Sequence, residues 1–499
     1  MPLTSKDPGH RGTSQPDSVE NASVRLKAVG QLHGVRKRVA VIGGGVAGLA
    51  AAVRIRDQAP ADTEIIVYEQ SGRLGGKLRT GDIAGTQVER GAESMLMSSP
   101  DGGESAAIRF ARRLGLGDSL VHPAAIPAAL AIGGKLERVP AGTLVGVPGD
   151  LSTLGAVATP KAGADRDEGR PLLAEGEDIA VGELVRARYG AEVADRLVDP
   201  MLGGVYAGRA DRLSLATTMP ALARTARTEH TLAGAVRAAQ AASVRAPGRP
   251  IFASLAGGMS SLIGAAAAAS GARISLGLPV RELQRTAHGW RLLLGPVPMP
   301  QTDDVDAVVL AVPASPAARM LAGIDLSAAA EVEVLGYASV ALAAFALPPG
   351  TELPELSGFL VPPGEGTLVK AATFFTRKWS HLATGDGPVI VRVSLGRDGE
   401  QERLQYDDSV LAATAHAELG RLLDTELPQP TASWVQRWGG GLPQYAPGHL
   451  DRVALARAAL NDHPGLALAG AAFDGVGVPA CVASGEKAAD DVLKYLEKR

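Results

Sequence analysis

The sequence has few cysteines, few aromatic residues and no long apolar run. Its 499 residues include one cysteine, Cys481, and 4% aromatic side chains. A single cysteine excludes a disulfide framework, so we expect a reducing, cytoplasmic setting. No stretch of about 18 uninterrupted apolar residues is present, so the sequence predicts no membrane-spanning helix.

Charge and histidine content argue against two further classes of function. The formal net charge is −3 and no long basic run occurs, which argues against nucleic acid as the main partner. The nine histidines are scattered, and no Cys/His spacing is typical of a metal site. Residues 1–36 are polar and rich in Ser, Pro and Gly, which predicts a disordered tail. The rest of the chain is too long for one core, so we expect two or three domains.

What the sequence does contain is a glycine-rich turn between a predicted strand and a predicted helix. Residues 38–42 form an apolar, β-branched run typical of a buried parallel strand. Gly43, Gly45 and Gly48 then form G-x-G-x-x-G, in which the glycines permit a tight turn, an approach to a pyrophosphate and close helix packing. The predicted helix, residues 46–57, would direct its N-terminal dipole at the phosphates.

The residues after the second predicted strand indicate which dinucleotide is bound. Residues 64–68 are followed by Glu69, some 20 residues after the last glycine, where an acidic side chain binds ribose hydroxyls and repels a 2′-phosphate. The stretch "SGRLGGKLRT" then places Arg73, Gly76 and Lys77 where FAD needs a second cradle for its pyrophosphate and ribityl chain. This arrangement favours FAD over NAD.

The C-terminal region is expected to supply the other half of the site. Residues 466–469 predict a strand, residues 470–477 a loop of small side chains, and Pro479 the start of a helix that continues to about residue 495. A helix N-terminus at this place would stabilise the anionic reduced flavin. Cys481 falls in the first turn of this helix and is interpreted as a small buried core residue.

The middle of the chain returns to the same domain. Strand, glycine turn, helix and strand are predicted within residues 250–278, and residues 306–312 predict a fully buried strand. We therefore expect an α/β fold, with a Rossmann-like FAD-binding domain of the amine-oxidase (GR2) type, a mixed-sheet α+β substrate domain and a helical domain. The expected ranges are 37–100, 248–315 and 430–499 for the FAD-binding domain, 101–117, 219–247 and 316–429 for the substrate-binding domain, and 118–218 for the helical domain.

Several stretches together resemble the porphyrinogen oxidases of haem biosynthesis, which are FAD-dependent members of the monoamine oxidase superfamily. "VIGGGVAGLAAA" and "LAGAAFDGVGVPACVASGEKAADDV" are shared by the whole superfamily, including amine oxidases and carotenoid desaturases. "GGVYAGRADRLSL" and "LPQYAPGH" are more selective. The resemblance covers residues 37–495, and the high Ala, Gly and Arg usage is similar to that of Gram-positive, actinobacterial members.

The motifs and the resemblance together imply a set of FAD contacts spread along the chain. These are Gly43, Gly44, Gly45, Val46, Ala47, Gly48, Glu69, Gln70, Arg73, Gly76, Lys77, Gly91, Ala92, Glu93, Ser94, Val280, Trp438, Gly475, Val476, Gly477 and Val478. Trp438 precedes a glycine-rich turn and is expected to wall the isoalloxazine ring, with a core tryptophan as the alternative.

Two departures from the family pattern bear on the site. Where relatives commonly read Gly-Pro-Asp or Gly-Pro-Arg, this chain has Gly91-Ala92-Glu93, and no Lys or Arg follows in "MLMSSPDGGES". The residues that anchor the substrate propionates therefore stay open. Covalent flavin attachment in amine oxidases is expected to need a cysteine in the C-terminal flavin loop. This chain has Phe473-Asp474-Gly475 there, so we expect non-covalent FAD.

The resemblance implies a reaction and a substrate. Oxidation of coproporphyrinogen III to coproporphyrin III removes six electrons, with oxygen as acceptor and three H2O2 as products; protoporphyrinogen IX is a further possible substrate. Basic groups at the rim of an apolar pocket are expected to hold the substrate. The candidates are Arg209, Arg212, Lys370, Arg377 and Lys378, for which solvated strand ends are an equal alternative. No catalytic acid or base can be named.

The resemblance also implies partners and a third region. Residues 118–218 correspond to a helical domain that contacts lipid in membrane-associated members, but residues 161–180 are strongly charged, so at most peripheral membrane contact is expected. A downstream enzyme of the ferrochelatase type is a possible partner. One helical face is predicted at Leu184, Val185, Tyr189, Val193, Leu197 and Met201.

Two other functions stay open. The chain could be another flavin oxidase of the superfamily that acts on an amine or a carotenoid, although 4% aromatic residues give little support to an amine-binding aromatic cage. It could also be a flavoprotein that binds porphyrin without catalysis. Peroxide release and porphyrin fluorescence separate these functions from the main one.

Overall fold

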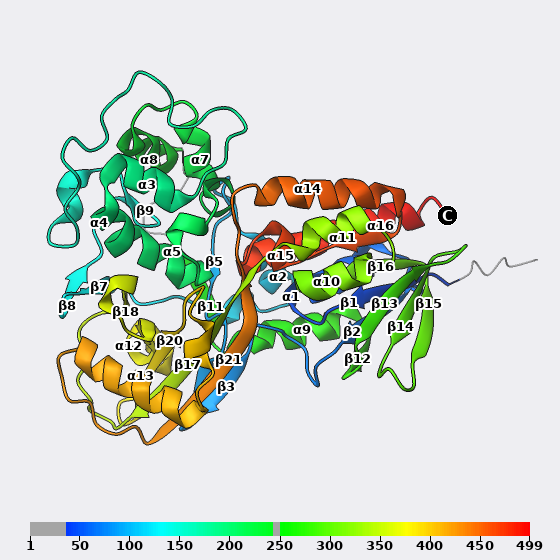
Figure 1. Ribbon diagram of the computed structural model, residues 1–499. Helices are drawn as coiled ribbons and strands as arrows, with labels where there is room; N and C mark the ends of the chain where they lie inside the picture. Colours follow the sequence, from blue (N-terminus) through cyan, green and yellow to red (C-terminus); the bar gives the residue numbers. More distant parts are fainter. Residues whose placement is uncertain (1–35, 243–249) are drawn as a thin grey trace, which may run out of the picture. The chain divides into compact units, whose positions relative to one another are not determined.

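The computed structural model describes residues 36–242 and 250–499 (Figure 1). The tail expected at residues 1–36 lies, apart from Arg36, outside the described residues. The protein contains a five-stranded sheet and a seven-stranded sheet. Figure 1 shows helices packed around the first sheet and a cluster of helices beside the second. This combination confirms the expected fold class.

The parallel five-stranded sheet carries the glycine-rich turn. Its strand order is β12-β2-β1-β16-β22, and every neighbouring pair is parallel. The strands are β1 (Arg38–Ile42), β2 (Glu64–Glu69), β12 (Arg273–Leu276), β16 (Ala307–Leu310) and β22 (Leu466–Leu468). Val41 lies beside Val67 and Val309, all buried, which explains the apolar β-branched runs. Strand order reverses at β1, and this leaves a crevice at the carboxyl ends of the strands.

Helices cover both faces of this sheet. Val39 and Val41 point to one face, and Ala40 and Ile42 point to the other. The first face packs against α1 (Val46–Gln58) and α16 (Val478–Leu496), which are flanked by α2 (Ala106–Arg113) and α9 (Ser260–Ser270). The second face packs against α10 (Ala314–Leu321), α11 (Leu326–Glu333), α14 (His449–Ala459) and the antiparallel strands β13 (Val280–Arg285), β14 (Trp290–Leu294) and β15 (Gln301–Val305).

Helices α1 and α16 touch through their backbones. A Cβ at Gly485 would lie only 2.0 Å from the carbonyl oxygen of Ala47, so a larger residue cannot stand there without moving one of the helices. Both helices begin at the crevice, α1 at Val46 and α16 at Val478, and neither has a side-chain cap. Their close packing therefore brings two uncapped helix N-termini to the same edge of the sheet.

The seven-stranded sheet has the order β21-β17-β20-β19-β18-β7-β8. Its strands are β7 (Ala128–Ile132), β8 (Lys135–Arg138), β17 (Tyr337–Leu347), β18 (Gly358–Leu360), β19 (Val369–Phe374), β20 (Val389–Leu395) and β21 (Ala432–Pro443). Helix α13 (Asp408–Leu422) packs on one face, and α12 (Phe375–Lys378) follows β19.

Two expected range boundaries are wrong for this sheet. Residues 432–443 were expected in the FAD-binding domain, but β21 pairs with β17 along most of its length. Residues 128–138 were expected in the helical domain, but β7 pairs with β18. The reason is the same in both cases, because strand partners far apart in sequence are set by tertiary pairing rather than by local pattern.

The helical cluster is formed by α3 (Val181–Tyr189), α4 (Ala191–Val193), a π-helical turn (Ala194–Val198), α5 (Asp199–Tyr206), α6 (Leu215–Thr218), α7 (Pro220–Ala226) and α8 (Leu232–Ala241). The predicted face from Leu184 to Leu197 is buried, and Met201 is partly buried. Gly190 has a φ of 103° and interrupts this face. The segment expected to be helical therefore breaks between α3 and α4. Helices α7 and α8 belong to this cluster rather than to the substrate domain expected at 219–247.

Short strands join the larger parts. The hairpin β3 (Thr80–Ile83) and β4 (Thr86–Glu89) leaves the five-stranded sheet, and β11 (Phe252–Leu255) pairs with both β5 (Met95–Leu96) and β6 (Leu120–Val121). Strands β9 (Thr143–Leu144) and β10 (Val147–Pro148) pair with each other, and α15 (Ala471–Asp474) precedes α16. Within residues 36–242 and 250–499, none of the helices combines the length and apolar character that crossing a membrane requires.

A buried lysine lies where the seven-stranded sheet meets the helical cluster. Lys370 on β19 is 6% exposed, and its Nζ donates a hydrogen bond to the carbonyl oxygen of Gly203 on α5 at 3.2 Å. Arg397 is also buried nearby. Burial and, next, the positive charge of Arg397 lower the pKa of Lys370 to about 7.

Replacing Lys370 with Met removes this titrating group and keeps an unbranched side chain. Because the folded pKa of Lys370 lies below its ordinary value of 10.5, the unfolded chain binds more protons above about pH 7. The wild type therefore gains stability from Lys370 as pH rises through this window, and Lys370→Met does not. Urea unfolding measures the unfolding free energy of the wild type and of the variant. We expect the difference, variant minus wild type, to fall by up to about 1.4 kcal/mol for each unit that the pH rises in this window. A constant difference would contradict this.

Candidate active site

A cavity lies at the carboxyl ends of β1, β2, β16 and β22. With its open mouth it encloses about 1320 Å³. The lining residues are Ile42, Gly43, Gly45, Val46, Ala47, Tyr68, Glu69, Gln70, Gly75, Gly76, Lys77, Leu78, Ala92, Val280, Ala311, Val312, Pro313, Pro316, Met320, Tyr337, Gly441, Leu442, Pro443, Gly470, Ala471, Ala472, Val476, Val478 and Cys481. The strand-order reversal at β1 places a ligand site at this edge.

At each position of the first motif, a different steric reason favours glycine over a residue with a side chain. Gly43 has a φ of 109°, and a Cβ on it would lie 2.3 Å from the carbonyl oxygen of Ala311. A Cβ on Gly48 would lie 2.0 Å from the carbonyl oxygen of Gly43. A Cβ on Gly45 would meet no atom within 4 Å, because Gly45 faces the cavity. The first and third glycines are thus required by the protein itself, and the second leaves room for a ligand.

Glu69 holds the glycine turn and also faces the cavity. Its Oε2 accepts a hydrogen bond from the backbone N–H of Gly44 at 2.9 Å, and its Oε1 accepts one from Ser71 N–H at 2.8 Å. Each carboxylate oxygen has a second lone pair, so the group can still accept hydroxyl donors from a ligand. This geometry is compatible with the expected ribose contact.

Lys77 brings positive charge to the cavity, and no carboxylate in the described part of the chain balances it. Burial lowers the pKa of Lys77, and among the described residues Cys481 alone acts in the opposite direction. Burial also raises the pKa of Cys481 to about 12, which keeps it a thiol. The N-terminus of α1 has no side-chain cap and no acidic residue in its first turn. The donors and charges at this end of the cavity suit an anionic ligand group.

The turn at residues 91–94 is packed tightly against Lys77. A Cβ on Gly91 would lie 1.9 Å from the Lys77 carbonyl oxygen, and Ala92 N–H donates to that oxygen at 3.1 Å. Only Ala92 of this turn lines the cavity. Trp438 packs against the same turn, where its Nε1 donates to the Arg90 carbonyl oxygen at 2.7 Å. Trp438 is absent from the described cavity lining, so the ring-wall role expected for it stays a prediction.

Glu93 turns away from the cavity into an ion-pair network. It pairs with Lys378 and, at 2.5 Å, with Arg392. Nη1 of Arg392 also donates to the carbonyl oxygens of Glu89 and Gly91, at 2.8 and 3.0 Å. Burial opposes ionisation of Glu93, but Lys378 and Arg392 outweigh it and keep the pKa of Glu93 below its ordinary value. The network fixes the Gly91 turn to β20.

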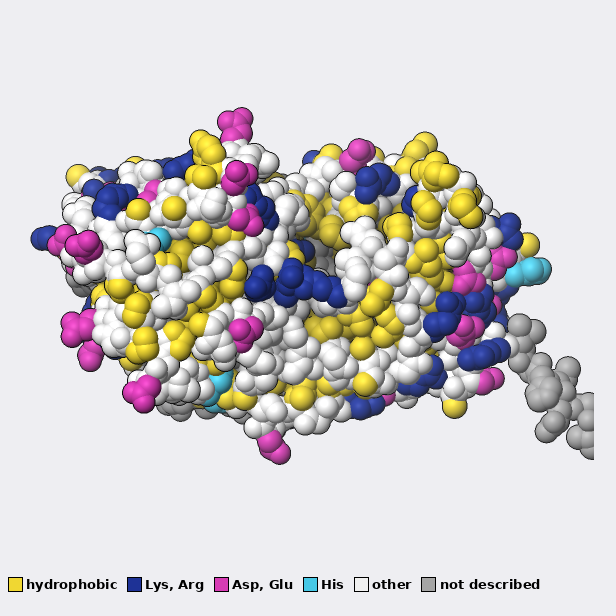
Figure 2. Space-filling model, turned by 90° about the horizontal axis from the view of Figure 1, so that it is seen from below, with side chains coloured by type: hydrophobic (Ala, Val, Ile, Leu, Met, Phe, Trp, Pro, Cys, Tyr) yellow, Lys and Arg dark blue, Asp and Glu magenta, His cyan; other side chains and the backbone are white. Residues whose placement is uncertain are grey.

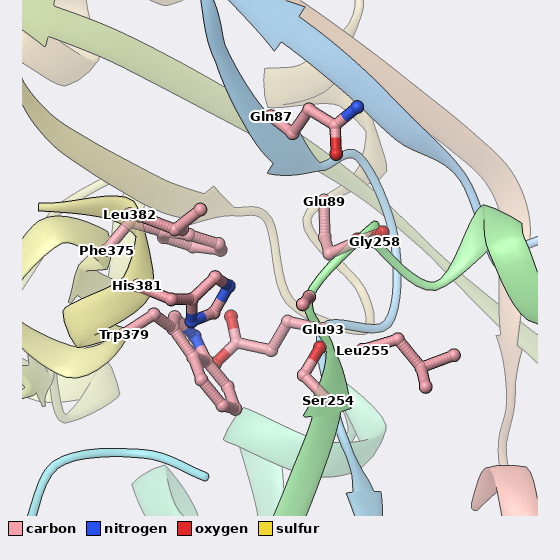
Figure 3. A pocket seen from close by; sticks show the side chains of 11 residues that line it. Gln87, Glu89, Glu93, Ser254, Leu255, Gly258, Phe375, Trp379, His381 and Leu382 are labelled. Atoms are coloured by element: carbon pink, nitrogen blue, oxygen red, sulfur yellow. The ribbon is translucent and has the colours of Figure 1, made fainter. Parts of the chain in front are cut away.

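A smaller pocket of about 280 Å³ lies beside this network (Figure 3). Figure 3 shows Trp379 and His381 on one side, Ser254 and Leu255 on the other, and Glu93 pointing between them. Glu89 contributes a second carboxylate, which is buried and accepts hydrogen bonds from Met259 N–H and the Thr80 hydroxyl, at 2.8 and 2.9 Å. Burial raises the pKa of Glu89.

The C-terminal loop supplies the opposite wall of the cavity. The predicted loop at residues 470–477 contains a short helix, α15, which the sequence reasoning missed because four residues carry too little pattern. Val476 and Val478 line the cavity, and Gly475 has a φ of 119°. Cys481 lies in the first turn of α16 and is buried and unpaired, as expected, but it also lines the cavity.

Several cavity residues were missed from the sequence. Residues 311–313 lie at the carboxyl end of the predicted strand 306–312 and directly after the observed strand β16, and this position was a signal that could have placed them at the site. Tyr337 and residues 441–443 belong to the seven-stranded sheet, and only the tertiary packing brings them to the cavity. Conversely, Gly44, Gly48, Arg73, Gly91, Glu93, Ser94, Gly475 and Gly477 are expected contacts that the lining does not include.

The basic residues expected at a substrate rim each have another environment. Lys370 is buried between β19 and α5, so its expected place at a rim is wrong. Lys378 pairs with Glu93, and Arg209 pairs with Asp199 at 3.3 Å. Arg212 pairs with Asp398 at 3.1 Å, and Arg377 is half-buried on α12. The role of the other four basic residues in substrate binding stays a prediction.

The comparisons with known proteins agree with this geometry. Residues 46–493 match the family described as flavin-containing amine oxidoreductases. The chain belongs to this family. The protein is therefore a flavin oxidoreductase.

Several relatives of this flavin oxidoreductase carry more specific names. It is 35% identical to the coproporphyrinogen III oxidase of Mycobacterium tuberculosis over 464 residues, which cover 92% of this chain and 97% of the relative. It is 29% identical to the coproporphyrinogen III oxidase of Bacillus subtilis, with 92% and 99% covered. It is 28% identical to human protoporphyrinogen oxidase, with 92% and 98% covered.

Solved structures share the fold. A crystal structure of a candidate protoporphyrinogen oxidase from Exiguobacterium sp. 255-15 has a TM-score of 0.77 and 28% identity, and the match covers 92% of this chain and 99% of that one. Cyclohexylamine oxidase from Brevibacterium oxydans has a TM-score of 0.64 and 17% identity, with 93% and 100% covered. The second likeness supports the fold alone.

Replacing Gly45 with Ala tests the glycine that faces the cavity. The added methyl meets no protein atom within 4 Å, so we expect an unchanged melting temperature. It occupies the space through which backbone N–H groups approach a pyrophosphate, so flavin content should fall at least about tenfold. Gly264→Ala on α9 is the matched control, because its added methyl is equally unobstructed and lies outside the cavity. Equal flavin absorbance in the two purified variants would contradict the assignment.

Replacing Glu93 with Gln tests the ion-pair network. The change leaves Lys378 and Arg392 without their carboxylate, and we expect the unfolding free energy at neutral pH to fall by about 3 kcal/mol. Because the pKa of folded Glu93 lies below its ordinary value of 4.5, its stabilisation is present above that pH and is lost as pH falls through the folded pKa. In denaturant unfolding, the difference in unfolding free energy between wild type and variant should therefore become smaller as pH falls. Identical stability at neutral pH would show that the network is not stabilising.

Proposed function

We propose that this chain is an FAD-dependent oxidase that converts coproporphyrinogen III into coproporphyrin III with molecular oxygen. The observation that carries the proposal is the cavity, because its features fit a flavin dinucleotide. The chain that forms this cavity matches 97% of the length of a coproporphyrinogen III oxidase. The human relative, a protoporphyrinogen oxidase, makes protoporphyrinogen IX the second candidate substrate.

The residues present fit FAD at each of its parts. The unobstructed side of Gly45 and the uncapped start of α1 suit the pyrophosphate, and the carboxylate of Glu69 suits the ribose hydroxyls. Lys77 supplies a cation that none of the described carboxylates neutralises. The start of α16 faces the same cavity through Val478 and suits the electron-rich edge of the ring. When bound, the flavin accepts two electrons per cycle and passes them to oxygen.

The chain itself orients, shields and holds charge. Three two-electron cycles balance the reaction, because a porphyrinogen loses six electrons and six protons and three oxygen molecules become three H2O2. Tyr337, Leu442 and Pro443 bring apolar surface from the seven-stranded sheet to the cavity and exclude water. The ion pairs of Glu93 keep the Gly91 turn against Lys77, so the site is formed before substrate binds.

The FAD is held without a covalent bond in this proposal. The cavity-facing Cys481 is the one thiol of the sequence, and its raised pKa, about 12, makes it a poor nucleophile. Precipitation of the holoprotein with acid should therefore release all flavin into the supernatant. A cytoplasmic location and transfer of the product to an enzyme of the ferrochelatase type also stay proposals.

The test is turnover by purified holoenzyme under air. Porphyrin fluorescence and H2O2 should rise together, with three H2O2 per porphyrin, and kcat/KM should be higher for coproporphyrinogen III than for protoporphyrinogen IX. A preference for protoporphyrinogen IX would overturn the choice of substrate. No turnover of either, with turnover of an amine or a carotenoid, would place the chain elsewhere in its family. Porphyrin binding without any turnover would indicate a non-catalytic flavoprotein.

A further inference from the structure

Three arginines beside the cavity, Arg73, Arg79 and Arg90, form what we call the arginine cluster. Arg79 directly follows Leu78, and Arg90 lies two residues before Ala92; both Leu78 and Ala92 line the cavity. Arg90 N–H donates to the Arg79 carbonyl oxygen at 2.6 Å, so the two residues lie opposite each other where β3 begins and β4 ends. Opposed residues of an antiparallel pair share a face, so both guanidinium groups leave the hairpin on the same side.

Strand β21 holds these side chains in place. Nη1 of Arg79 donates to Oε1 of Gln436 at 2.7 Å, and the guanidinium of Arg90 lies over the ring of Trp434, 4.6 Å from its centroid. Alternate residues of a strand face the same side, so Trp434 and Gln436 form one wall. The two cations are therefore oriented before any ligand arrives, which lowers the entropy cost of binding an anion.

Within residues 36–242 and 250–499, the cluster lacks the carboxylate counter-ions that other arginines of the protein have. Arg38 pairs with Glu64 and Asp303, and Arg186 pairs with Asp195 and Asp211. By contrast, burial and then the charge of Arg73 lower the pKa of both Arg79 and Arg90, and among the described residues no carboxylate opposes this shift.

Basic side chains also gather on the surface of the protein. Figure 2 shows Lys and Arg side chains in the middle of one face, at the edge of a hollow. Guanidinium groups that repel one another and have no internal partner gain most from an external anion. The expected pyrophosphate contacts of the cofactor lie at Gly45, the start of α1, Arg73 and Lys77, so Arg79 and Arg90 are left for a second anionic group.

We propose that Arg79 and Arg90, supported by the field of Arg73, bind the carboxylate groups of the tetrapyrrole where it protrudes from the cavity. This inference rests on the proposed function. A macrocycle with carboxylates on its periphery buries its apolar ring and leaves the acids at the rim, where planar guanidinium groups bind them in a bidentate manner. The cluster therefore distinguishes substrates by their number of carboxylates and favours a tetracarboxylate over a dicarboxylate.

The experiment uses the holoenzymes of Arg79→Gln, Arg90→Gln and the double variant. We measure flavin content, KM and kcat for coproporphyrinogen III and protoporphyrinogen IX, and the Kd of coproporphyrin III from its fluorescence. Flavin content and kcat should be unchanged. Each single change should raise KM and Kd for the tetracarboxylate roughly three- to tenfold, the double change should raise them further, and the dicarboxylate should respond less.

Two control variants separate charge from structure. Arg90→Lys keeps the positive charge and should retain most of the affinity, whereas a structural defect at Arg90 would persist in it. Arg224→Gln removes an exposed arginine on α7 and should leave every constant unchanged. Added salt should raise the wild-type KM for coproporphyrinogen III and should affect the double variant less, because fewer charges are left to screen.

Two outcomes overturn the inference. Unchanged KM and Kd in the double variant would show that the cluster does not bind the substrate, and a loss of flavin from that variant would assign the arginines to the cofactor. Failure of the proposed function gives a different result, namely no turnover of either porphyrinogen by the wild type. In that case the Kd of coproporphyrin III in wild type and double variant still decides whether the cluster binds a tetrapyrrole carboxylate.

Discussion

The backbone contact at the first glycine turn is the constraint on which the rest of the site depends. Gly43 packs against the carbonyl oxygen of Ala311 on the neighbouring strand, and Gly48 packs against Gly43, at separations that exclude any side chain. The same closeness recurs where Gly485 meets Ala47. Because these contacts fix α1 and α16 against the sheet, both helix N-termini reach the same cavity. A wider separation would remove the donors that suit a pyrophosphate.

Charge is distributed around the cavity in two different ways. The Glu93 network neutralises Lys378 and Arg392 internally, and it thereby anchors the Gly91 turn to the seven-stranded sheet. Lys77 and the arginine cluster, in contrast, have no carboxylate partner among the described residues. Paired charges stabilise the fold, whereas unpaired cations leave electrostatic free energy that a bound anion can recover. This difference separates structural from ligand-binding cations better than residue type does.

The first motif, the strands around it and the fold class were predictable because each depends on local pattern. A β-branched run, three spaced glycines and Glu69 report their own environment within a few residues, and the structure places Gly45 and Glu69 at the cavity. The basic residues were not predictable in this way. Lys370 and Lys378 carry the same charge and lie eight positions apart, yet one is buried beside Gly203 and the other pairs with Glu93. Burial and pairing depend on partners far along the chain.

The sequence by itself determined a glycine turn of the kind that suits a dinucleotide, since the steric demands of a pyrophosphate turn act on consecutive residues. It also carried the motifs that indicate the family. Only the tertiary structure decided which strands share a sheet, as β21 and β7 show, and which cations stay free to meet a ligand. The physical reason is that strand pairing and charge compensation join residues far apart in sequence, up to 436 positions in the ion pair of Arg54 and Asp490, and no local pattern records such partners.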